Sequence, residues 1–238
     1  MTNLQDLSVK IFADGADLDS IERLTHDPRI SGFTTNPTLM HKAGLSNYEA
    51  FAKEVLTTVE TLPVSFEVCA DDFESIERQA RTISGWAQNV YVKVPVTTTK
   101  GESTSEVVRR LSGDGVKVNV TALFTIPQIE TMTRAVQHGA PSNLSVFAGR
   151  IADAGVDPVP VVREAVAVAT AAPSTELIWA SPREVLNVVQ AAQAGCHIIT
   201  MTGDLLAKLD GLGRDLAEFS LETVRMFHRD AATAGLDV

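Results

Sequence analysis

Cysteine is scarce in this chain, and basic side chains are outnumbered by acidic ones. Only Cys69 and Cys196 occur in 238 residues, too few for a disulfide scaffold and without the ligand spacing of a zinc site. Each lies in or beside an apolar stretch, so we expect buried free thiols in a reducing compartment. The net charge of -10 argues against nucleic acid or an anionic membrane as a partner. A small phosphorylated substrate stays compatible with it, because a local pair of arginines can hold a phosphate.

Long apolar runs are also absent. None approaches the roughly 20 residues of a membrane span, and the N-terminal residues 1–6 lack the basic and apolar regions of a signal peptide. The charged fraction of 21% and the hydrophobic fraction of 45% are normal for a soluble globular protein. We therefore predict a cytoplasmic protein.

Short apolar strands alternate with longer amphipathic segments along the chain. The expected strands are 9–13, 32–35, 64–68, 91–96, 116–120, 144–148, 177–180 and 197–200. The expected helices are 18–25, 48–59, 73–88, 103–111, 127–138, 159–172, 184–194, 203–209 and a further one over 216–232.

Such an order predicts an α/β fold, a single TIM (β/α)8 barrel with an extra C-terminal helix over about 214–238. The alternative is a doubly wound open sheet, but Asp14-Gly15-Ala16-Asp17 does not match its glycine-rich first turn. No linker or composition break appears, so residues 1–238 are expected to form one domain.

Lys93 stands in the middle of the apolar strand 91–96. A strand that is apolar on both faces is typical of a parallel sheet covered by helices. Desolvation of an ammonium group is costly unless the charge is lost or paired, and it lowers the pKa of a lysine and frees a nucleophilic amine. Lys93 is therefore a candidate for Schiff-base chemistry. The alternative is a lysine at the strand end that reaches solvent.

Further polar residues stand at the ends of the predicted strands, where a TIM barrel carries its chemistry. They are Asp14, Thr34, Asn36, Glu67, Asn119, Thr121, Arg150, Ser181 and Arg183. Simpler interpretations exist for several of them: Asp14 as a helix cap, Asn36 as a turn residue, Thr34 as a β-branched strand residue and the arginines as solvated side chains. Asn119 and Thr121 share one face of their strand and can both point into the barrel. An unpaired buried carboxylate at Glu67 would be expensive.

Six segments, in order along the chain, resemble the transaldolase family, specifically the short forms related to fructose 6-phosphate aldolase. They are Phe12-Ala13-Asp14, Gly32-Phe33-Thr34-Thr35-Asn36-Pro37, Val92-Lys93-Val94-Pro95, Asn119-Val120-Thr121, Phe147-Ala148-Gly149-Arg150 and Ala180-Ser181-Pro182-Arg183. The Thr-Thr-Asn-Pro turn and the Val-Lys-Val-Pro strand are the most specific of these motifs.

The resemblance implies class I Schiff-base chemistry that needs neither a metal nor an organic cofactor. Lys93 would attack the C2 carbonyl of a ketose phosphate, and Asp14 would take the proton of the C4 hydroxyl. Glu67 and Thr121 would hold a proton-shuttling water. The resemblance assigns substrate binding to Thr34, Asn36, Asn119, Ser145, Phe147, Arg150, Ser181 and Arg183, with the two arginines on the phosphate.

The implied reaction converts sedoheptulose 7-phosphate and glyceraldehyde 3-phosphate into erythrose 4-phosphate and fructose 6-phosphate. The aldolase branch has Gln in place of Glu67 and Tyr in place of Phe147, so transfer is favoured over net cleavage. Pro182 stands where relatives often have Phe, which leaves a related anion such as a sulfonate as an alternative head group. Outside enzymes, the alternative is a barrel that only binds a sugar phosphate.

The short members of the family form pentamers or decamers, in which a C-terminal helix reaches a neighbouring subunit. The resemblance therefore implies a homo-oligomer in which the helix expected over 216–232 makes that contact. A plain closing helix of the barrel is the alternative.

Overall fold

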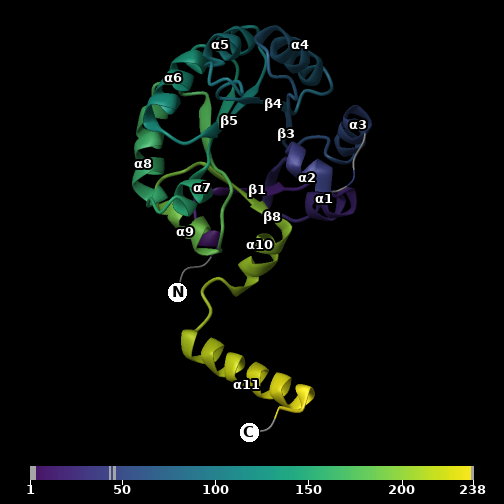
Figure 1. The fold of residues 1–238 in the computed structure, drawn as a ribbon, viewed down its shortest axis with the longest axis vertical. Helices are drawn as coiled ribbons and strands as arrows, with labels where there is room; N and C mark the ends of the chain where they lie inside the picture. The colour runs from purple at the N-terminus through teal and green to yellow at the C-terminus, as the bar shows by residue number, and fades with distance from the viewer. Residues whose placement is uncertain (1–3, 43, 45–46, 237–238) are drawn as a thin grey trace.

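The computed structural model describes residues 4–42, 44 and 47–236. Eight parallel strands form a closed barrel in sequence order, as the ribbon in Figure 1 shows, which confirms the expected architecture. They are β1 (Lys10–Asp14), β2 (Ile30–Thr34), β3 (Val64–Glu67), β4 (Val90–Pro95), β5 (Val118–Leu123), β6 (Ser142–Val146), β7 (Thr175–Trp179) and β8 (Ile198–Thr202). Of the segments interpreted above, residues 1–3 and 237–238 lie outside the described part.

Helices surround the barrel, and one further helix, α11, follows them (Figure 1). The helices are α1 (Leu18–Thr25), α2 (Pro37–Lys42), α3 (Tyr48–Thr58), α4 (Phe73–Ser84), α5 (Ser105–Gly113), α6 (Ile126–Val136), α7 (Ala148–Asp153), α8 (Pro158–Ala169), α9 (Leu186–Gln193), α10 (Gly203–Lys208) and α11 (Leu216–Ala234). Side-chain caps explain several starts: Asp17 and Asp72 each accept a backbone N–H of the first turn, and Thr125 forms a capping box with Gln128.

An apolar layer fills the barrel beneath the C-terminal ends of the strands. Phe12, Ile178 and Ile198 form a buried cluster there, separate from the main core between strands and helices. A Cβ atom at Gly32 would lie 2.6 Å from the Phe12 ring, so glycine makes room for that ring. Because side chains alternate along a strand, the residue two places after each of these three residues also points inward and lies above the apolar layer. Polar side chains therefore meet above an apolar floor.

Some boundaries differ from the sequence prediction, and two short helices were not predicted at all. These are α2 and α7, each of six residues, which is too short for a periodic apolar pattern. Strand β5 continues to Leu123 instead of ending at residue 120. Helix α9 begins at Leu186 rather than at residue 184, because the Asn187 side chain accepts the backbone N–H groups of Arg183 and Glu184.

The two cysteines lie in different surroundings. Cys196 is buried as predicted, and burial raises the pKa of its thiol to about 12. Cys69 is exposed, so the expectation of a buried thiol was wrong at that position. It follows the end of β3, where the chain has left the covered part of the sheet.

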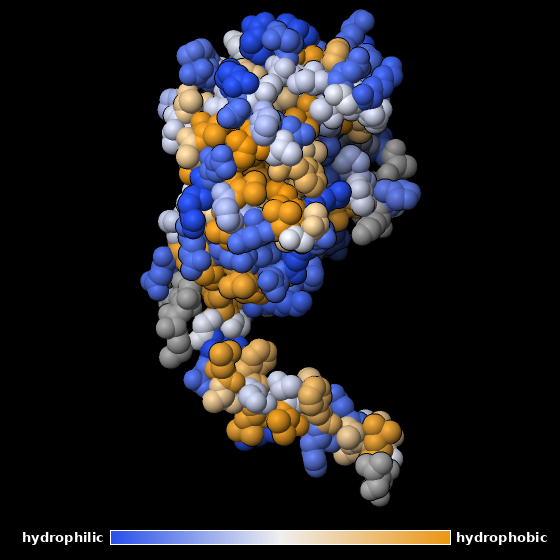
Figure 2. Space-filling view, turned by 60° about the vertical axis from the view of Figure 1, so that its left-hand side comes forward, coloured by the Kyte–Doolittle hydropathy of each residue, from blue (hydrophilic) through white to orange (hydrophobic). Residues whose placement is uncertain are grey.

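Helix α11 lies apart from the barrel (Figure 1) and buries none of its residues. Its large apolar side chains are exposed, and Figure 2 shows them as orange spheres along the helix. They are Leu216, Phe219, Leu221, Val224, Met226 and Phe227. Across the described residues, α11 included, no helix combines the length and the apolar character that crossing a bilayer requires.

Candidate active site

A cavity of about 480 Å³ opens at the C-terminal ends of the strands. Every site residue predicted from the sequence, except Asn119, lines it: Asp14, Thr34, Asn36, Glu67, Lys93, Thr121, Ser145, Phe147, Arg150, Ser181 and Arg183. Thr200 of β8, which the sequence analysis did not single out, lines it as well. The barrel thus brings together side chains that are up to 186 residues apart in the chain, the separation between Asp14 and Thr200.

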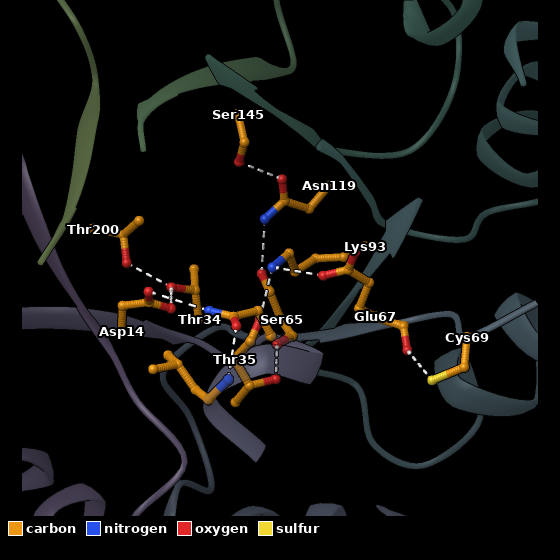
Figure 3. Close-up of polar contacts among 12 residues, drawn as sticks. Asp14, Thr34, Thr35, Ser65, Glu67, Cys69, Lys93, Asn119, Ser145 and Thr200 are labelled. Atoms are coloured by element: carbon orange, nitrogen blue, oxygen red, sulfur yellow. Dashed lines mark hydrogen bonds and ion pairs between the residues drawn. The ribbon is translucent and has the colours of Figure 1, made fainter. Parts of the chain in front are cut away.

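Lys93 points into this cavity from β4 and is only 6% exposed. Its Nζ lies 3.0 Å from Glu67 Oε2, because parallel pairing sets Glu67 of β3 beside Lys93 of β4. The same Nζ donates a hydrogen bond of 2.7 Å to the backbone carbonyl of Thr35 (Figure 3). The solvent-reaching alternative is therefore wrong, and the cost of burying the ammonium group is offset by a carboxylate and a carbonyl.

Asp14 ends β1 and is held by neighbouring side chains (Figure 3). Thr34 Oγ1 donates a bond of 2.7 Å to Asp14 Oδ1 and lies 2.5 Å from Thr200 Oγ1, while Asn36 Nδ2 donates to Asp14 Oδ2 at 3.4 Å. Burial raises the pKa of Asp14 above its ordinary value, against the opposing effects of Lys93, Thr34 and Asn36. Asp17 caps α1, so the alternative of Asp14 as a helix cap is wrong.

Asn119 is held by side chains of two other strands and does not line the cavity. Its Nδ2 donates to Ser65 Oγ at 3.0 Å, and its Oδ1 accepts from Ser145 Oγ at 2.7 Å (Figure 3). The side chain does point into the barrel, as predicted, but it is fully buried there. In this structure the amide ties β3, β5 and β6 together through Ser65 and Ser145, and contact of Asn119 with a substrate stays a prediction.

The two arginines line the opposite part of the cavity from β3 and β4. Arg150 lies in α7 rather than at the end of a strand, with its guanidinium 5.4 Å from the centre of the Phe147 ring. Arg183, in the loop after β7, forms an ion pair with Asp153 of α7. One of the two cations therefore already has an anionic partner.

Close backbone contact fixes α7 against the loop after β7. A Cβ atom at position 149 would lie 1.5 Å from the Ser181 carbonyl oxygen, so only glycine fits there. Ser181 itself has a φ of 57°, a left-handed conformation that is uncommon for serine. These features set the backbones that carry Arg150 and Arg183, both of which adjoin this contact.

Three residues of the site were missed by the sequence prediction, two of them because no sequence pattern marks their role. The Thr35 carbonyl and the Asp153 carboxylate act through contacts that only the folded chain makes. Thr200 had a weak signal, since it stands two residues after the buried Ile198 on the inward face of β8. Within the described ranges, no group of three or more His, Cys, Asp or Glu residues is placed to hold a metal ion.

Relatives described as probable transaldolases resemble this chain over most of its length. The family model described as "Transaldolase/Fructose-6-phosphate aldolase" matches residues 11–237. A probable transaldolase 2 of Listeria monocytogenes is 35% identical over 202 residues, which cover 84% of this chain and 88% of that protein. A probable transaldolase of Methanococcus maripaludis is 35% identical over 225 residues, covering 91% of this chain and 100% of that protein.

Two solved structures share the fold at low sequence identity. Dihydrodipicolinate synthase from Rhodopseudomonas palustris matches with a TM-score of 0.58 and 16% identity, covering 93% of this chain and 80% of that one. A structure described as "Native KDPGal structure" matches with a TM-score of 0.56 and 16% identity, covering 84% of each chain. These likenesses concern the barrel, whereas the family model and the relatives identify the chain, which belongs to the transaldolase/fructose-6-phosphate aldolase family of enzymes.

Proposed function

We propose that the protein is a transaldolase that moves a dihydroxyacetone unit between sugar phosphates through a Schiff base on Lys93. The observation that carries the proposal is the buried Lys93 amine, which faces the cavity with the Glu67 carboxylate 3.0 Å away. A buried lysine next to a proton acceptor is the arrangement that imine formation uses. The proposed reaction is that of sedoheptulose 7-phosphate with glyceraldehyde 3-phosphate, giving erythrose 4-phosphate and fructose 6-phosphate.

Imine formation begins with loss of a proton from the Lys93 ammonium to Glu67. The neutral amine attacks the C2 carbonyl of the ketose, and one of its two remaining protons moves to the oxygen to give the carbinolamine. Glu67 then returns the first proton to that hydroxyl, which leaves as water. A water held between Glu67 and Thr121 carries these protons, since both residues line the cavity. The product is an iminium ion whose positive charge attracts electrons from the C3–C4 bond.

Carbon–carbon cleavage uses the Asp14 carboxylate as the base. Asp14 takes the C4 hydroxyl proton, the C3–C4 electron pair moves into the iminium, and an aldose phosphate leaves with a new C4 carbonyl. The enamine left on Lys93 then attacks the acceptor aldehyde, and Asp14 returns its proton to the new hydroxyl. A raised pKa suits both tasks, because it makes the carboxylate a better base without stopping it from releasing the proton.

The charged end of the substrate is assigned to Arg150 and Arg183, and hydroxyls of the three-carbon unit to Ser181, all of which line the cavity. Guanidinium groups hold phosphate oxygens in forked geometry. Glu67 and Phe147 favour transfer over net aldol cleavage: Glu67 exchanges protons, and Phe147 has no hydroxyl to protonate the enamine. An aldolase would release product from fructose 6-phosphate without any acceptor aldehyde. A transferase would release only traces of product under the same conditions.

Borohydride reduction in the presence of fructose 6-phosphate tests the proposal. A transaldolase gives a protein mass increased by one reduced three-carbon unit, on the peptide that contains Lys93. The same reduction without sugar is the control and leaves the mass unchanged. A protein that gains no adduct with any ketose phosphate is a binding barrel or acts by another mechanism, and the proposal then fails.

Asp153 is expected to compete with the substrate phosphate for Arg183. The pair is half exposed, so its strength corresponds to about 1 kcal/mol or less. Asp153→Asn should therefore lower the KM for a phosphorylated acceptor about two- to threefold with kcat unchanged, as steady-state kinetics will measure. Glu164→Gln, which removes an exposed carboxylate of α8, is the matched control. A raised KM would mean instead that Asp153 holds Arg183 in its binding position.

We infer that the protein is a homo-oligomer, a pentamer or decamer as in short members of the family, with α11 packed on a second copy of the chain. A helix that exposes several large apolar side chains and buries nothing in its own subunit is typical of an interface. Phe227→Asp should place a charge in that contact and yield smaller species in light scattering. Phe73→Asp on α4, another partly exposed phenylalanine, is the control. A monomeric wild-type protein contradicts the inference.

A further inference from the structure

We propose that Tyr48 is a positioning residue for the Lys93 amine. Its hydroxyl replaces β2 as the hydrogen-bond partner of the Glu67 peptide and so leaves the Thr35 carbonyl free to accept from Lys93. The catalytic consequence rests on the proposed function, whereas the geometric part concerns the structure alone.

The ladder between β2 and β3 stops one bond early. It is regular up to the bond from Thr35 N to the Ser65 carbonyl, at 3.1 Å. In a parallel pair the next bond would run from Glu67 N to the Thr35 carbonyl. Instead, Glu67 N donates to Tyr48 Oη at 2.7 Å, and the Thr35 carbonyl accepts from Lys93 Nζ at 2.7 Å. A strand carbonyl has thereby become a ligand of the lysine.

One hydroxyl satisfies the whole Glu67 peptide on this side. Tyr48 Oη accepts from Glu67 N at 2.7 Å and donates to the Glu67 carbonyl at 2.8 Å. Burial raises the pKa of the Tyr48 phenol, which keeps the proton needed for the second bond. The residue held in this way is the one whose carboxylate pairs with Lys93. Tyr48 therefore acts on both partners of Lys93. It binds Glu67 directly, and by taking the Glu67 N–H it leaves the Thr35 carbonyl free to accept from Lys93.

The Tyr48 ring is itself held from outside the barrel. Asn47 caps α3 by accepting from Ala50 N at 3.1 Å, which makes Tyr48 the first residue of the helix. The ring packs edge-on against Phe66 and Trp86, with centroid distances of 6.3 and 5.8 Å. Tyr48 is absent from the lining of the site cavity and lines a separate groove between α3 and α4. It therefore acts through Glu67 and Thr35 and not on the substrate.

Tyr48→Phe removes the single oxygen atom and leaves the ring cluster. The freed Glu67 N–H can then complete the ladder with the Thr35 carbonyl, which takes that acceptor from Lys93. We expect kcat and the rate of borohydride trapping to fall about tenfold, the effect of one charge-assisted hydrogen bond. The KM for the acceptor should stay within about twofold, because the arginine end of the cavity is untouched.

Tyr91→Phe is the matched control, since Tyr91 is the other tyrosine of the chain and stands two residues before Lys93. The described structure records no hydrogen bond of its hydroxyl. Both variants are assayed well below their melting temperatures, so that lost stability alone does not lower kcat. Equal kcat values for Tyr48→Phe and Tyr91→Phe overturn the proposal.

A crystal structure of Tyr48→Phe gives the second readout. We expect the distance between Lys93 Nζ and the Thr35 carbonyl to exceed about 3.5 Å, the limit of a hydrogen bond. A distance still near 2.7 Å overturns the proposal whatever the kinetics. If the wild-type protein forms no adduct with fructose 6-phosphate, the proposed function fails, while this distance still decides whether Tyr48 positions the carbonyl.

Discussion

Lys93→Met is expected to abolish the borohydride adduct and to lower transaldolase activity to below roughly 10⁻⁴ of the wild-type value. Methionine fills a similar volume in β4 but has no amine, so the covalent route through an imine is closed. Losses of about this size follow removal of a nucleophile that works as a unit with its base. The measurement is the rate of fructose 6-phosphate formation, with protein mass after reduction as the independent readout.

The same substitution leaves Glu67 without its cation. Removing one partner of a buried ion pair destabilises a protein by about 3–5 kcal/mol, and the open cavity here places the expected loss at the lower end. The double variant Lys93→Met with Glu67→Gln should recover most of that stability in thermal unfolding, yet remain inactive. It therefore separates loss of chemistry from loss of folding.

The double variant can also contradict the assignment of the Schiff base to Lys93. Activity in the well-folded double variant within about tenfold of wild type would move the Schiff base to another lysine or remove it from the mechanism. An adduct located by peptide mass on Lys10, Lys100 or Lys117 would do the same.

Lys93 and Glu67 were predictable because they depend on short-range patterns and one topological rule. Each interrupts an apolar strand, and parallel strands of a barrel end at the same face. Their pairing at 3.0 Å then follows from the register of neighbouring strands. The sequence motifs named the same residues by resemblance, and they also predicted the family that the comparisons show.

The depth of a side chain in the barrel was not predictable in this way. Asn119 and Thr121 lie on the same face of β5, and period two identifies that face. Which of them reaches the cavity depends on the stagger of β5 against β3 and β6, where Ser65 and Ser145 engage the Asn119 amide. Stagger is a property of the closed barrel and has no local signal.

Contacts between distant segments were also beyond the sequence. Arg183 and Asp153 are 30 residues apart, and Tyr48 and Glu67 are 19 apart. Arg150 was expected at a strand end because the six residues of α7 are too few to show a helical period. The sequence thus predicted two arginines that are free to bind phosphate. In the folded chain Arg183 is paired with Asp153.

Asp14→Asn is expected to lower kcat by about 10²- to 10⁴-fold, the usual contribution of a general base. The amide keeps the shape of the side chain and its contact with Thr34, so the KM for the acceptor should change little. Borohydride trapping of the donor should persist, since imine formation uses Glu67 and not Asp14. Loss of trapping in this variant would give Asp14 a part in imine formation instead.

The same variant is expected to be more stable than the wild-type protein at neutral pH. Burial raises the pKa of Asp14 in the folded state above its ordinary value of 3.8. Between these two pKa values the folded protein binds more protons than the unfolded chain, so the free energy of unfolding falls as the pH rises through this window. Above the folded-state pKa this loss of stability remains in full. The gain in stability from Asp14→Asn should therefore be largest near pH 7 and shrink as the pH falls toward 4.

Asp17→Asn is the control, and its expected change in stability has the opposite sign, because hydrogen bonds from Ser20 lower the pKa of Asp17. Thermal unfolding of both variants across this pH range decides: equal pH dependence in the two would mean that Asp14 is not an unfavourably buried carboxylate.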